Sequence, residues 1–153
     1  MSKFIDNIAV IHNNIFSLTP ILVSFYKNLK RQERNILLAY FVFPIVFNQE
    51  CLKDLIKVRS NSRLSRIALN KKCMAGFAER FEYYKDITNS CLQYAIDCKY
   101  IKIEEDLSVV ADSETSLYTD PSLTDSLRLA SQLHNIFTLD VLNTYLAFGI
   151  KHL

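Results

Sequence analysis

One uninterrupted apolar run limits what this chain can fold into more than any other feature. It extends from Ile36 to Phe47, reads ILLAYFVFPIVF and is bounded by Asn35 and Asn48. The run is too short to cross a bilayer, because a transmembrane helix needs about 20 apolar residues. We therefore expect a core helix that Pro44 kinks or restarts. In a small chain such a helix is hard to cover completely, so a partner-facing surface is the alternative. The contact residues on that alternative are Phe41, Phe43 and Phe47.

The composition indicates one mainly helical domain. With 153 residues, 50% of them apolar, the chain can bury a core without disulfide bonds. Only two glycines and three prolines argue against a turn-rich β-sandwich or barrel. The net charge of +2 is too small for a protein that coats DNA, so any contact with nucleic acid must be local.

Residue patterns divide the single domain, 1–153, into four parts. N-terminal helices occupy 1–50. The first has apolar residues spaced three and four apart, as on one face of a helix: Ile15, Leu18, Leu22, Phe25, Tyr26 and Leu29. Because Pro20 falls inside this stretch, the first helix is expected to begin near Pro20 with Thr19 as its cap. A winged-helix part occupies 51–111, an acidic loop 112–123 and C-terminal helices 124–153. The last helix is expected to place Leu142, Tyr145 and Leu146 on one inner face, and to end at Gly149.

The winged-helix part is predicted from the order of its elements. An amphipathic helix opens at Thr88, and Tyr100 to Ile103 then alternates like a strand. Glu104 to Asp106 can form a turn, from which 107–111 returns as the second strand of a hairpin. The predicted fold class is therefore mainly α, with a winged helix-turn-helix core, one β-hairpin, and flanking N- and C-terminal helices.

The outer face of the second helix favours protein over DNA as its partner. A DNA-reading helix normally presents cations and amides to the major groove. Here the outer stripe is Asn89, Gln93 and Asp97, with Tyr100 following the helix, and it holds an acid but no base. The acidic hairpin turn would also repel phosphates. We expect these four residues to bind a protein partner.

A basic stretch from Lys53 to Lys72 is the better candidate for DNA or an acidic partner. It has seven cations and one acid, Asp54. A solvated helix face explains such a run about as well as a phosphate contact does. The candidate contact residues are Arg59, Arg63, Arg66, Lys71 and Lys72.

The sequence has no recognisable set of catalytic, cofactor-binding or metal-binding residues. Two glycines are too few for a Walker A loop or a dinucleotide fingerprint. The three histidines lie in unrelated contexts, so no nucleophile, base and acid constellation can be assembled. We expect neither catalysis nor a cofactor.

The four cysteines are expected to be free, buried thiols in a reducing cytoplasm. They form no C-x-x-C pair, and the N-terminus lacks the plan of a signal peptide. A zinc site is disfavoured because nothing has finger-type spacing. The cysteines are Cys51, Cys73, Cys91 and Cys98.

Several short segments, taken in order, resemble one family. They are LLAYFVFPIVFNQE, SRIALN, AGFAERF, ITNSCLQYAIDCKYIKIEEDLSVV and the terminal YLAFGIKHL. Together they are similar to the middle component of ABC-three-component systems, the group that includes the small subunit of Lamassu-type defence operons. The resemblance covers about Asn14 to the end.

This resemblance implies a non-catalytic adaptor in a hetero-oligomer. The partners would be an SMC- or Rad50-like ABC ATPase and an effector, often a nuclease, acting against phages or plasmids. DNA would be contacted mainly through the partners, and no membrane is involved. The alternative is a stand-alone winged-helix DNA-binding transcriptional regulator that uses the basic stretch.

Overall fold

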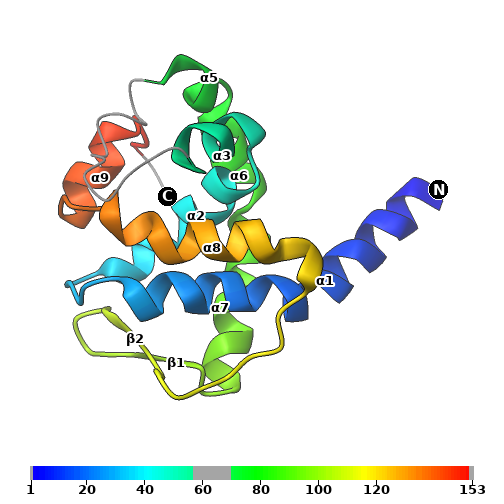
Figure 1. The fold of residues 1–153 in the computed structure, drawn as a ribbon, viewed down its shortest axis with the longest axis horizontal. Helices are drawn as coiled ribbons and strands as arrows, with labels where there is room; N and C mark the ends of the chain where they lie inside the picture. Colours follow the sequence, from blue (N-terminus) through cyan, green and yellow to red (C-terminus); the bar gives the residue numbers. More distant parts are fainter. Residues whose placement is uncertain (1, 57–69, 152–153) are drawn as a thin grey trace.

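The computed structural model describes residues 2–56 and 70–151, with side chains from residue 15 onward except at 52 and 54–56. These described residues are mainly helical with one antiparallel hairpin, as predicted. Within the described ranges, no helix has the length and apolarity that crossing a membrane requires. Figure 1 shows α1 and α8 side by side across the middle of the molecule, with the hairpin on one side and the shorter helices on the other.

The first helix, α1 (Ser2–Asn28), is one continuous helix and does not begin near Pro20. Pro20 lies inside it, and the Thr19 hydroxyl donates back to the Ile15 carbonyl over 2.6 Å instead of capping a new helix. The second half of α1 packs on α7 (Lys85–Asp97) and α8 (Thr124–Gln132). The first half extends beyond the body of the molecule (Figure 1).

The apolar run forms the 3-10 turn η1 (Asn35–Leu38) and α2 (Ala39–Val46) at the centre of the core. Phe41 is fully buried, and its ring centroid lies between 4.7 and 6.2 Å from those of five other aromatic rings. Phe43 is fully buried too, whereas Phe47 is half-buried. Of the two alternatives for the run, the core helix therefore holds for Phe41 and Phe43, which have no exposed surface to offer a partner.

Between α2 and α7 the described residues form α3 (Gln49–Ile56), α5 (Lys71–Met74) and α6 (Phe77–Tyr83). Gly76 separates α5 from α6 with a φ of 67°, a left-handed conformation that glycine adopts at little cost. Thr88 does not open α7, which begins three residues earlier at Lys85. Instead, its buried hydroxyl donates to the Tyr84 carbonyl over 2.7 Å.

The hairpin consists of β1 (Ile101–Ile103) and β2 (Val109–Ala111), with Ile101 opposite Ala111. Its turn is docked on the connector between α1 and η1. The Arg34 and Ile36 amides donate to the Asp106 and Leu107 carbonyls over 2.9 and 3.2 Å. The predicted order of helices followed by a hairpin is present, and the winged-helix assignment itself stays a prediction.

The chain continues through η2 (Pro121–Leu123), α8, η3 (Leu133–Asn135) and α9 (Val141–Ala147). Gly149, with a φ of 71°, lies just beyond the end of α9, as expected. The predicted inner face of α9 is only partly right. Tyr145 is buried, but Leu142 and Leu146 are 68% and 60% exposed.

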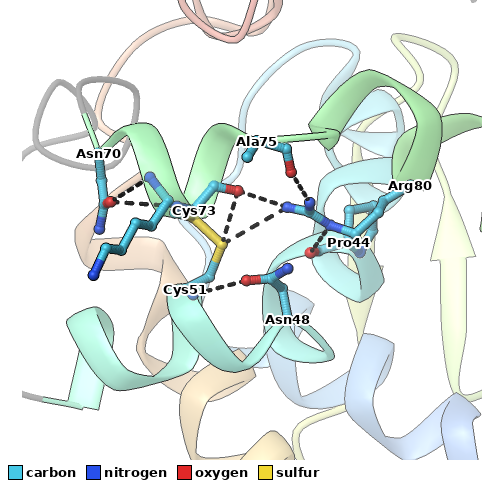
Figure 2. Close-up of a disulfide and its surroundings, with 8 residues drawn as sticks. Pro44, Asn48, Cys51, Asn70, Cys73, Ala75 and Arg80 are labelled. Carbon is cyan, nitrogen blue, oxygen red and sulfur yellow. Dashed lines mark hydrogen bonds between the residues drawn. A yellow bond between two sulfur atoms is a disulfide. The ribbon is translucent and has the colours of Figure 1, made fainter.

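Cys51 of α3 and Cys73 of α5 form a disulfide, so the expectation of four free thiols is wrong for this pair. Figure 2 shows the Arg80 guanidinium next to the disulfide, and its Nη2 donates to the Cys73 carbonyl over 2.7 Å. Arg80 also donates to the carbonyls of Ala75 and Pro44. This charged side chain thus connects α2, α5 and α6. Of the remaining cysteines, Cys91 is buried and Cys98 is exposed.

Candidate functional site: a groove along α7

The outer stripe predicted on the second helix lies on the exposed face of α7. Asn89, Gln93 and Asp97 are spaced four apart, which places them in line on one face of a helix. All three are exposed. The opposite face of α7 is held in the core by Cys91, Leu92 and Ala95, which fixes the direction of the outer stripe.

This stripe forms one wall of a shallow hollow of about 580 Å³, which we call the α7 groove. Residues of α1 form the other wall. Phe16 is 62% exposed, and its ring lies edge-on to Tyr94 with centroids 5.1 Å apart. The residues that line the groove are Ile15, Phe16, Asn89, Ser90, Gln93, Tyr94 and Asp97.

Hydrogen bonds hold the polar side chains of the groove in place. The Tyr40 hydroxyl donates to Asn89 Oδ1, and Gln93 Nε2 donates to Asp97 Oδ1 over 2.9 Å. Hydrogen bonding with the Cys98 thiol, more than burial, raises the pKa of Tyr94 to about 12. Burial also raises the pKa of Tyr40. Both phenols are therefore neutral hydrogen-bonding groups at physiological pH.

The groove offers two amides, a hydroxyl, one neutral phenol, one carboxylate and an exposed aromatic ring. Its lining includes no lysine or arginine among the residues that the structure describes. Because phosphate binding depends on cations, this lining fits a protein surface better than a nucleic-acid backbone. Aromatic side chains of this kind are enriched where proteins bind each other.

The remaining predicted partner-binding residues lie in different places. Tyr100 is half-buried and adjoins the groove, with its ring 6.1 Å from that of Tyr94. Phe47 packs against Phe43 and Tyr84, away from the groove lining. The structure therefore brings Tyr100 close to the outer stripe and separates Phe47 from it.

The acids of the hairpin turn have partners within the chain. Asp106 accepts hydrogen bonds from the Ser108 amide and hydroxyl, which keep the pKa of its carboxyl low, and it lies 4.0 Å from Arg31. Glu104 lies 3.9 Å from Lys102. The turn is thus a docked element of the fold, and Glu105 is exposed beside it.

The described part of the basic stretch consists of its ends. Arg59, Arg63 and Arg66 lie outside the described residues. Lys71 and Lys72 are exposed at the start of α5, where the Asn70 side chain accepts from the Lys72 and Cys73 amides. These two lysines are thus on the surface, as a contact with DNA or an acidic partner would require.

Sequence reasoning missed Phe16 and Tyr94, the aromatic residues of the groove. Phe16 follows Ile15, the first residue of the predicted inner face of α1, so its position next to that face was a usable signal. Tyr94 lies between Gln93 and the buried Ala95, and only the packing of α1 on α7 shows that it faces the groove.

Fold and site together define a small, mainly helical protein whose groove carries side chains typical of a protein-binding surface. Among residues 2–56 and 70–151, no cluster of three or more His, Cys, Asp or Glu side chains could hold a metal ion. The chain belongs to the family described as ABC-three component (ABC-3C) system Middle Component 3, whose sequence model matches residues 2–152. The resemblance to a middle component is thereby confirmed. The comparisons with curated proteins and with solved structures gave no match.

Proposed function

We propose that this middle component is a non-catalytic adaptor that links an SMC- or Rad50-like ABC ATPase to an effector, often a nuclease. The assembly would defend a prokaryotic cell against phages or plasmids, as in Lamassu-type systems. ATP hydrolysis and DNA cleavage would belong to the partners. Family membership over residues 2–152 supports the place of the chain in a three-component system.

The α7 groove is the observation that carries the adaptor role. Its exposed Phe16 ring gives a partner an apolar anchor, and the amides of Asn89 and Gln93 give it hydrogen-bonding groups. Asp97 contributes negative charge, which disfavours phosphate. An apolar centre with a polar rim is the usual anatomy of a protein interface.

A linking role also needs a second surface. The exposed leucines of α9 lie on an element that is separate from the groove, and α9 and the free end of α1 lie at opposite sides of Figure 1. Two partners can therefore bind without competing for the same side chains. This arrangement supports an adaptor over a protein with a single binding site.

The test is co-purification of the tagged full chain with the other two components of its own system, all expressed together. Gln93→Arg with Asp97→Lys reverses the charge of the groove at exposed positions. We expect this variant to lose one partner and to lose protection in a phage or plasmid challenge. Gln132→Arg, at an exposed position at the end of α8, is the matched control and should behave as wild type.

Retention of both partners by the groove variant would contradict the assignment of the α7 groove. Failure of the wild-type chain to retain either component would contradict the adaptor role. The competing hypothesis, a stand-alone DNA-binding regulator, instead predicts that the isolated chain binds DNA with a steep dependence on salt. It also predicts that changing Arg59, Arg63 and Arg66 to Glu abolishes that binding.

A further inference from the structure

A second hollow, of about 350 Å³, lies between α9 and the start of η1. Its exposed apolar side chains are Leu142 and Leu146, spaced four apart and therefore adjacent on one face of α9. Beneath them lie Leu37, which is half-buried, and the buried Tyr145, whose hydroxyl donates to the Leu37 carbonyl over 2.6 Å. We call this surface the α9 patch.

The large apolar side chains of the α9 patch are exposed to water, so their burial contributes little to the stability of the isolated chain. Leu142 and Leu146 are 68% and 60% exposed, whereas most residues of the core are below one-tenth. Exposed leucines that line a hollow can receive the apolar face of an amphipathic helix, as the walls of a hydrophobic groove do. A surface of this kind in a subunit of a multi-component system is typical of a partner-binding site.

Charge identifies the chemistry of the occupant. Arg34 and Lys151 are exposed and line the hollow, and no acid lines it among the described residues. The Arg34 guanidinium has an acidic neighbour in Glu33, 3.5 Å away, but both side chains are about two-thirds exposed. Such an exposed pair is worth little, so Arg34 remains available to a carboxylate of a partner.

Self-association fits this surface less well. A two-fold contact would place the same patch against itself and bring the cations of both copies into one interface. Like charges at an interface suppress binding. A partner with apolar and acidic side chains meets both features of the patch at once.

We propose that the α9 patch binds an amphipathic helix of another component of the same system. The helix presents apolar side chains to the two leucines and carboxylates to the two cations. This inference rests on the proposed adaptor function, and it assigns the second partner to a surface distinct from the α7 groove.

The experiment uses the tagged full chain co-expressed with the other two components. Leu142→Ala with Leu146→Ala is expected to weaken retention of one component by at least about tenfold, because the two truncations remove apolar surface that the complex would bury. Alanine keeps the helix, so the thermal midpoint of the isolated variant should not fall. The matched control is Tyr83→Ala with Tyr118→Ala, which removes two side chains that are 74% and 80% exposed elsewhere.

A second arm tests the charges. Lys151→Glu is expected to weaken retention of the same component at low salt. The difference from wild type should shrink as salt is added, because salt screens exposed charges. The groove variant Gln93→Arg with Asp97→Lys should leave this component in place and release the other.

Each contrary result points to a different error. If wild type retains both components and the leucine variant does so equally well, the α9 patch is wrongly assigned and the adaptor role stands. If wild type retains neither component, the adaptor role fails and this inference fails with it. If the isolated chain forms a dimer in sedimentation that the leucine variant abolishes, the occupant is a second copy, which overturns the proposal.

Discussion

Breaking the disulfide between Cys51 and Cys73 should lower the stability of the chain by a predictable amount. The two cysteines are 22 residues apart, and a cross-link mainly restricts the unfolded chain. The loop-entropy relation for a loop of this length gives about 3.4 kcal/mol at 25 °C. With a urea slope of about 2 kcal/mol/M, reduction should move the unfolding midpoint down by about 1.7 M.

The assay is urea unfolding of the isolated chain with and without reductant, followed by circular dichroism. The variant Cys51→Ala with Cys73→Ala is the control, since its midpoint should be low and insensitive to reductant. Cys98→Ser, at an exposed free thiol, should respond to reductant as wild type does. Together the two variants separate the effect of the cross-link from other effects of the reducing agent.

Thiol titration supplies an independent readout. Unfolded protein without reductant should expose two thiols, those of Cys91 and Cys98, and reduction should raise the number to four. In folded protein Cys98 should react first, because burial holds Cys91 out of solvent and raises its pKa to about 11. Four thiols without reductant, or identical urea midpoints with and without it, would refute the reasoning.

Three further predictions concern single side chains. Asn35→Ala should cost about 1–3 kcal/mol, because it leaves the buried Val109 amide without the Oδ1 acceptor that now lies 2.7 Å away; hydrogen exchange at that amide should accelerate. Arg80→Lys should destabilise by a similar amount in urea unfolding, since an ammonium cannot reach the same three carbonyls as a planar guanidinium. Burial raises the pKa of Tyr26 well above 10, so its contribution to the free energy of unfolding is complete below pH 10 and is lost as pH rises beyond that value; Tyr26→Phe should flatten the fall of the thermal midpoint above pH 10.

The pattern of apolar residues predicted most of the fold because burial follows periodicity. Leu22, Phe25 and Tyr26 were expected on one face of the first helix, and all three are buried. The alternation around Ile101 and the acidic turn likewise predicted the hairpin. These are local signals, and they needed no knowledge of tertiary contacts.

The errors arose where tertiary packing overrides a local rule. Pro20 is a helix breaker by propensity, yet the contacts of α1 with α7 and α8 keep the helix continuous through it. Leu146 repeats the spacing of a core residue but lies outside, because Tyr145 fills the inner position of α9. The pairing of Cys51 with Cys73 depends on how α3 meets α5, which spacing alone does not reveal.

The sequence predicted the exposed stripe of the candidate site, but not which other residues lie next to it. Asn89, Gln93 and Asp97 follow from helical spacing, and the structure places them on one exposed face. The opposite wall of the groove comes from α1, more than 70 residues earlier in the chain, so no local pattern could supply it. The exposure of the leucines of α9 could not be predicted either, because an apolar stripe has the same spacing whether it faces a core or a partner.

The length of α1 has a mechanical consequence. At about 1.5 Å per residue, its 27 residues extend for about 40 Å, longer than the roughly 30 Å diameter of a small domain. Part of the helix therefore extends beyond the rest of the molecule, and it continues through Pro20 without a break. We expect a pull on its free end to rotate α1 against α7 and α8. The rings of Phe16 in α1 and Tyr94 in α7 are in contact, with centroids 5.1 Å apart. A change in the distance between these two rings would report that rotation.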